Sequence, residues 1–104
     1  MDKNKWLREA NNTSIKIWFT PVTGDDNFAT LSTEELTRLA YELSKTVTGN
    51  TRSIALVDSG IDGKDRYGLF SLSAELLANH TCTDVVKILK ENYPMQIKDI
   101  LYIG

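Results

Sequence analysis

Residues 32–50 read STEELTRLAYELSKTVTGN and predict one amphipathic helix. Ser32 and Glu35 stand three residues apart, the spacing of a capping box in which each side chain accepts a hydrogen bond from the other residue's backbone N–H. The apolar residues that follow recur at helical spacing on one face: Leu36, Leu39, Ala40, Leu43 and Val47. Gly49 can adopt the left-handed backbone that ends many helices. The helix is therefore expected to begin after Ser32 and to end at Gly49.

The segment before this helix contains one predicted strand. In residues 14–20, SIKIWFT, the side chains of Ile15, Ile17 and Phe19 alternate with those of Lys16 and Trp18. Alternation of β-branched and aromatic residues predicts a half-buried strand with Trp18 on the opposite face from the isoleucines. Residues 20–31 are polar and are expected to form a loop. Residues 1–13 are expected to form either a short helical turn or a loosely held arm.

The segment after the helix predicts two strands, a second helix and a last strand. Residues 53–58 are nearly all apolar, as in a strand buried on both faces, and Gly60 with Asp62-Gly63 predicts a hairpin turn. The next strand is expected from near Tyr67 to about residue 73, while residues 74–80 fit either a strand or a helix. Thr81 or Thr83 is expected to cap a helix that ends before Pro94, and residues 100–103 predict a short final strand.

The predicted element order is strand, helix, strand, strand, helix, strand. This order is that of the split βαβ arrangement, and we expect an α+β fold with a four-stranded, mostly antiparallel sheet and two main helices on one face. A related α+β order with different strand pairing is the alternative. The 104 residues have the length of a single domain, and we expect one domain over residues 1–104.

Composition and charge disfavour several classes of protein. The formal net charge of −2 is unlike that of a dedicated nucleic-acid binder, which needs an excess of Lys and Arg. Apolar stretches stay well short of the roughly 20 residues that span a bilayer. A single cysteine, Cys82, fits a reducing compartment. We therefore expect a cytoplasmic protein that contacts neither membrane nor nucleic acid directly.

The residues needed for common catalytic and metal chemistry are sparse. One histidine, His80, and one cysteine, Cys82, are too few for a structural zinc site, and they face one another only if a strand extends through them. The loop containing Asp58, Asp62 and Asp65 lacks the glutamate that completes an EF-hand, since Leu69 stands in its place. We expect no enzyme activity, no catalytic residue, no metal and no cofactor.

The distribution of charge favours a protein-binding role. No basic residue lies between Lys16 and Arg38, and that interval contains four acidic residues. An acidic patch with nearby aromatic anchors is suited to a basic protein partner. The predicted partner-binding residues are Trp18, Asp25, Asp26, Phe28, Glu34, Glu35, Asp58, Asp62, Asp65 and Tyr67. The alternative is that the acids serve only the helix start and turns, and that Trp18 belongs to the core.

In size, mild acidity and α+β layout, and in residues 14–20, 54–68 and 100–104, the chain resembles the immunity proteins of contact-dependent growth inhibition and related polymorphic toxin systems. Those proteins share no motif, so the resemblance assigns no residue a role. It implies a protein that neutralises a cognate bacterial toxin, first of all a nuclease, by covering its active site. Alternatives are a small enzyme or ligand-binding regulatory domain, a phage-encoded inhibitor of a host defence protein, and an adaptor whose residues 100–103 pair between copies; the oligomeric state stays open.

Overall fold

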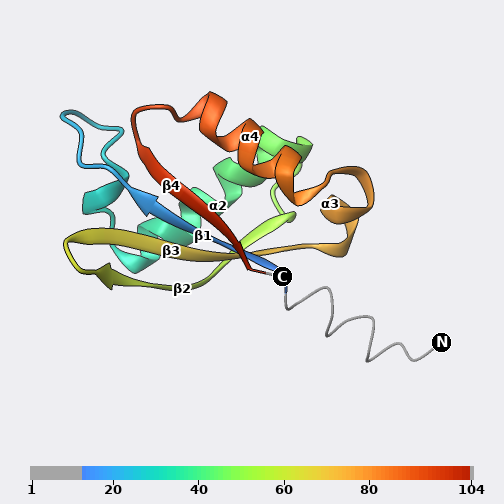
Figure 1. The fold of residues 1–104 in the computed structure, drawn as a ribbon, viewed down its shortest axis with the longest axis horizontal. Coiled ribbons are helices and arrows are strands. Elements are labelled where there is room, and N and C mark those ends of the chain that lie inside the picture. Colours follow the sequence, from blue (N-terminus) through green and yellow to red (C-terminus); the bar gives the residue numbers. More distant parts are fainter. Residues whose placement is uncertain (1–12, 104) are drawn as a thin grey trace.

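The computed structural model describes residues 13–103. Within these residues, four strands and three helices, with one short 3-10 turn, follow one another (Figure 1). In order they are β1 (Ser14–Phe19), η1 (Phe28–Thr30), α2 (Thr33–Thr48), β2 (Ile54–Asp62), β3 (Asp65–Leu72), α3 (Ala74–Asn79), α4 (Cys82–Asn92) and β4 (Ile97–Ile103). None of the described helices is both long and apolar enough to cross a bilayer.

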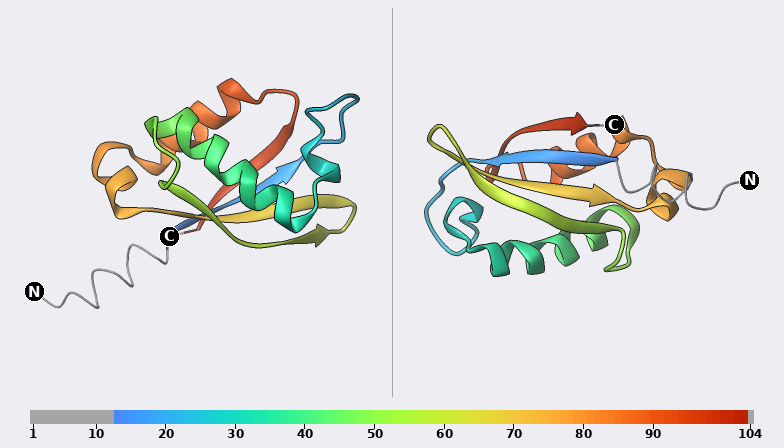
Figure 2. Two further views of the ribbon diagram at one scale, coloured as in Figure 1. Left: turned by 180° about the vertical axis from the view of Figure 1, so that it is seen from behind. Right: turned by 90° about the horizontal axis from the view of Figure 1, so that it is seen from below.

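The strands form one antiparallel sheet in the order β2-β3-β1-β4. β1 and β2, which α2 connects, lie on either side of β3, as the split βαβ arrangement requires. The helices pack on one face of the sheet and leave the other face open (Figure 2). The predicted α+β class and strand–helix order are confirmed.

The core lies between the sheet and the two long helices. β1 contributes Ile15, Ile17 and Phe19, all fully buried, and α2 contributes the apolar stripe that the sequence predicted. The predicted capping box is present, since Ser32 Oγ accepts from the Glu35 N–H and Glu35 Oε1 accepts from the Ser32 N–H. α2 ends as expected at Gly49, whose φ is +83°.

The prediction that residues 53–58 form a strand buried on both faces is wrong. β2 is an edge strand, and Val57 is 59% exposed. The pairing with β3 shifts between Leu56 and Asp58, which places Val57 in a bulge. Bulges and charges protect an exposed strand edge from pairing with other chains, and β2 combines the Val57 bulge with Asp58.

Other boundaries differ from the expected ones by a few residues. β3 already begins at Asp65, because Gly63, with φ +65°, allows a tight turn directly after Asp62. Ser73 caps the short helix α3, which decides between the two alternatives for residues 74–80 in favour of helix. Thr81 caps α4, and β4 begins at Ile97 rather than at residue 100. The turn or arm expected over residues 1–13 lies, except for Thr13, outside the described residues.

Candidate functional site

A shallow, open groove runs between the loop after β1 and the first turns of α2. Its volume is about 300 Å³. Four carboxylates, one guanidinium and three apolar side chains line this acidic groove: Asp25, Asp26, Phe28, Leu31, Glu35, Arg38, Leu39 and Glu42. Four negative charges against one positive charge give the groove a strong attraction for cations.

The wall opposite α2 is held in place by hydrogen bonds. Asn27 caps η1, with its Oδ1 accepting from the Ala29 N–H at 3.2 Å and from the Val22 N–H at 3.4 Å. Arg66, on β3, donates from Nε and Nη2 to the Leu31 carbonyl at 3.2 and 3.1 Å, and from Nη1 to the Gly60 carbonyl. The loop is thus anchored both to itself and to the β2–β3 hairpin.

The acidic residues in and beside the groove differ in whether they already form hydrogen bonds or ion pairs within the protein. The Ser32 backbone N–H, then the Ser32 hydroxyl and the charge of Arg38, lower the pKa of Glu35 below its ordinary value. Glu34, which is absent from the groove lining, lies 3.8 Å from Arg38 at an exposed position. Asp25 and Asp26 are exposed, and neither forms an ion pair with any residue in 13–103. Together with Glu42, which is also exposed and outside the ion pairs of residues 13–103, these carboxylates are accessible to a partner.

Phe28 lies mostly in the core, and its role as a partner-binding residue stays a prediction. Its side chain is only 7% exposed, and its ring packs against Phe19 and Tyr93 with centroid separations of 5.9 and 5.6 Å. The loop after β1 crosses the end of the core, and Phe28 is the loop side chain that packs into this core. Phe28 also forms part of the apolar base of the groove.

A second cluster, which contains three of the predicted residues, lies on the open face of the sheet. Trp18 and Tyr67 are paired across β1 and β3. Lys16 Nζ lies 4.8 Å from the Trp18 ring centroid and 4.4 Å from that of Tyr67. Asp62 Oδ2 accepts from Trp18 Nε1 at 3.1 Å and lies 3.5 Å from Lys16 Nζ. We call Lys16, Trp18, Asp62 and Tyr67 the open-face cluster.

Gly60 makes room for the Tyr67 ring. The two residues are paired across β2 and β3, and a Cβ atom on Gly60 would lie 2.9 Å from the Tyr67 hydroxyl and 3.1 Å from two ring carbons. The aromatic ring therefore lies across the glycine backbone. This position brings it to the Lys16 ammonium.

Asp58 and Asp65 complete the predicted acidic residues on this face. Asp65 accepts from Lys98 Nζ at 2.8 Å, and Asp58 Oδ1 accepts from the Ser59 N–H. The hairpin that carries them lies at the same end of the molecule as the loop of the acidic groove (Figure 1). The structure thus places the predicted acids at one end but on two surfaces, one beside α2 and one on the open sheet face.

His80 and Cys82 lie at the ends of two different helices. His80 is the residue that ends α3, while Cys82 begins α4 and lines a pocket of about 230 Å³ with Thr83, Val86, Ile100 and Tyr102. The thiol of Cys82 raises the pKa of Tyr102. Among residues 13–103, no three His, Cys, Asp or Glu side chains converge to hold a metal ion.

Several residues of these surfaces were not predicted. Arg38 and Glu42 line the groove because they lie three and seven residues after Glu35, and that helical spacing was a usable signal. Lys16 shares a strand face with Trp18 and could have been included on the same ground. Arg66 carried no signal in the sequence, since its contact with Leu31 joins segments 35 residues apart.

Comparisons of the chain with protein families, with curated proteins and with solved structures find no significant match.

Proposed function

We propose that this protein is a cytoplasmic immunity protein that binds a basic toxin, of which a nuclease is the first choice, and neutralises it by covering its active site. The acidic groove carries this proposal. A nuclease presents lysine and arginine side chains to the phosphates of its substrate, and carboxylates can bind those same side chains.

The composition of the groove supports binding to a protein rather than to a small ion. Carboxylates from the loop and from α2 surround an apolar base that includes Leu31 and Leu39. A partner's basic side chain brings an aliphatic stem with its charge, so it can satisfy both parts of such a groove. Charged pairs across interfaces of this kind show coupling energies on the order of 1.5–7 kcal/mol.

Affinity capture with an activity assay tests the proposal. The immobilised protein is exposed to an extract of the producing cells, bound material is eluted with salt, and the eluate is assayed for cleavage of RNA and DNA. We expect one basic protein whose nuclease activity is inhibited when the free chain is added back. Captured protein without toxic activity, or activity that the chain leaves unchanged, would contradict the proposal.

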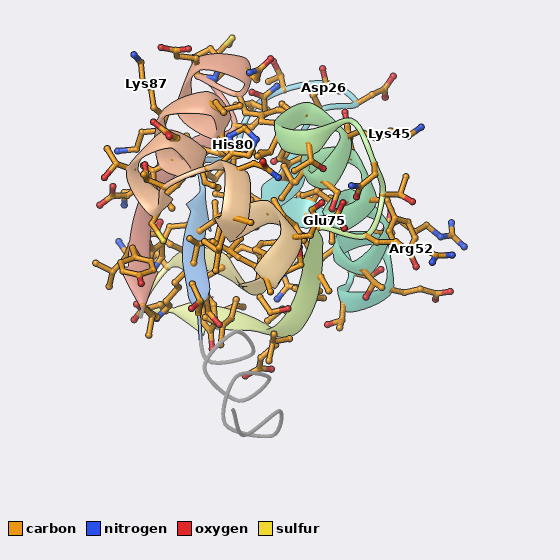
Figure 3. All side chains as sticks on the ribbon, turned by 90° about the vertical axis from the view of Figure 1, so that its right-hand side faces the viewer. Asp26, Lys45, Arg52, Glu75, His80 and Lys87 are labelled. Atoms are coloured by element: carbon orange, nitrogen blue, oxygen red, sulfur yellow. The ribbon has the colours of Figure 1, made fainter. Side chains whose placement is uncertain are left out.

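Charge reversal then tests the role of the groove. With the captured partner, Asp25→Lys combined with Asp26→Lys should lower the association rate constant at low salt by about 10-fold or more and flatten its salt dependence. For a matched single reversal, Asp26→Lys is compared with Glu75→Lys. Glu75 is on α3 (labelled in Figure 3), and α3 lies at the opposite end of the molecule from the loop after β1 (Figure 1). Equal effects of the two single variants would remove the groove from the binding mechanism.

A further inference from the structure

We infer that Trp18, Tyr67 and Asp62 form a cation-binding site, filled by Lys16 in the free protein, that accepts an arginine side chain of the partner in exchange. This inference rests on the proposed function and adds to it a second, defined point of contact on the open sheet face.

The site already contains a cation, which shows what chemistry it accommodates. The Lys16 ammonium lies 4.8 and 4.4 Å from the two ring centroids, within the roughly 6 Å at which an aromatic face attracts a cation. Asp62 adds a carboxylate whose position is fixed by the 3.1 Å hydrogen bond from Trp18 Nε1. Gly60 contributes by leaving room for the Tyr67 ring close to the β2 backbone.

Lys16 fits this site only loosely. Its Nζ is 3.5 Å from Asp62 Oδ2, whereas Lys98 Nζ is 2.8 Å from Asp65 Oδ2 on the same hairpin. Strong pairs between an ammonium and a carboxylate have N–O distances near 2.7–2.9 Å. The Asp62 side chain is also 54% exposed, so it can accept further hydrogen bonds from outside.

An arginine suits the vacated position better than a second lysine. A guanidinium is planar, stacks on aromatic rings and donates two parallel hydrogen bonds to a carboxylate. Lys16 has a flexible four-carbon stem and can turn its ammonium to solvent when it is displaced. Asp58, four residues before Asp62 on β2, is a further exposed carboxylate, whereas Asp65 is already paired with Lys98.

Fluorescence of Trp18 provides a direct test that needs no toxin. Trp6 is first replaced by phenylalanine, which leaves Trp18 as the one tryptophan. The probes are N-acetyl-L-arginine amide and its neutral isostere, N-acetyl-L-citrulline amide. Removing the competing ammonium with Lys16→Met should tighten binding of the arginine amide about fivefold relative to the parent protein, as expected from one cation–π contact. The citrulline amide should not bind.

Two controls make the result specific. Lys98→Met removes the same charge from the sheet away from the rings and should leave binding as in the parent. Adding Asp62→Asn to Lys16→Met should abolish binding. Thermal unfolding establishes that each variant is folded, and Lys16→Gln replaces Lys16→Met if the latter is not. No saturable change with the Lys16 variant, an equal change with Lys98→Met, or binding that survives Asp62→Asn overturns the inference.

The outcome is independent of the groove experiment. Asp25→Lys with Asp26→Lys should leave binding of the arginine amide unchanged, because the groove lies beside α2 and not on the open face. Failure of the amide to bind therefore removes this site alone. Failure to capture a toxin removes the proposed function, and with it the partner's arginine as the occupant, but it leaves the cation binding that the amide titration measures.

Discussion

Ser44 joins α2 to the edge strand β2 through a pair of buried hydrogen bonds. Its hydroxyl accepts from the Ile54 N–H at 2.6 Å and donates to the Ile54 carbonyl at 3.2 Å. The side chain is fully buried among apolar residues, so water cannot replace either bond. This hydroxyl therefore provides the hydrogen-bond partner of both the N–H and the carbonyl of Ile54, the first residue of β2.

We expect Ser44→Ala to lower the free energy of unfolding by about 1–3 kcal/mol, because it leaves two buried backbone groups without their partner. Urea denaturation measures the change. Thr37→Ala is the comparison, since its hydroxyl also bonds a backbone carbonyl but lies exposed on α2; its effect should stay within about 0.5 kcal/mol. Equal effects of the two substitutions would refute the role given to Ser44.

Gly60 permits a second prediction about a single position. Gly60→Ala adds a methyl group where 2.9 Å separates it from the Tyr67 hydroxyl, so the ring must move. We expect the ring-current shifts of the Lys16 side-chain protons to decrease in NMR spectra, because Lys16 loses its contact with Tyr67. Asp58→Ala, on the same strand, should leave these shifts in place. Unchanged Lys16 shifts in Gly60→Ala would show that the ring does not depend on the glycine.

At the level of elements, the two long helices begin in the same way. Ser32 with Glu35 starts α2, and Thr81 with Asp84 starts α4, each as a complete capping box. In both, the backbone N–H of the capping residue is the main cause that lowers the pKa of the carboxyl group. A carboxyl whose pKa is lower in the folded state stabilises the fold above its ordinary pKa, and this contribution is lost as the pH falls through the folded value.

We therefore expect the stability of the protein to decline as the pH falls from about 5 to about 3. The variant Glu35→Gln with Asp84→Asn should show a flatter decline over this range, with the remaining slope owed in part to Asp62, whose pKa the Trp18 hydrogen bond also lowers. Thermal unfolding at a series of pH values measures this slope. Glu75→Gln with Glu91→Gln neutralises two exposed carboxyl groups outside the boxes. If that pair flattens the profile as much, the capping boxes are not the cause.

The capping boxes also explain which elements the sequence predicted well. A cap, an apolar stripe and a glycine stop are local signals, and α2 matched them from Ser32 to Gly49. β2 was misjudged because an apolar run cannot distinguish a central strand from an edge strand with a bulge at Val57. The sequence left residues 74–80 undecided, because the alternation of apolar residues favoured a strand while the residue types favoured a helix. In the structure Ser73 caps a helix there.

At the scale of the whole molecule, the fold concentrates negative charge at one end. The loop after β1, the start of α2 and the turn of the β2–β3 hairpin meet there, and Arg66 and the Thr33–Ser59 hydroxyl pair connect them. Lys45 and Arg52 extend from the region where α2 ends, at the other end of that helix (Figure 3). The sequence showed the run of acids but not this arrangement, because pairing of distant segments decides which acids share a surface.

This uneven distribution of charge predicts where a basic peptide binds the protein. At low salt, a ten-residue arginine peptide should shift the backbone amide resonances of residues 25–42 and 58–67 in NMR titration and leave those of α3 in place. Exposed charges are screened over about 10 Å at 0.1 M salt, so the shifts should largely vanish at about 0.3 M salt. Asp25→Lys with Asp26→Lys should remove the shifts of residues 25–42 and leave those of residues 58–67, because the acidic groove and the open sheet face attract cations independently. Shifts spread evenly over the molecule would mean that the acidic end has no distinct field, and the electrostatic basis for partner binding would be lost.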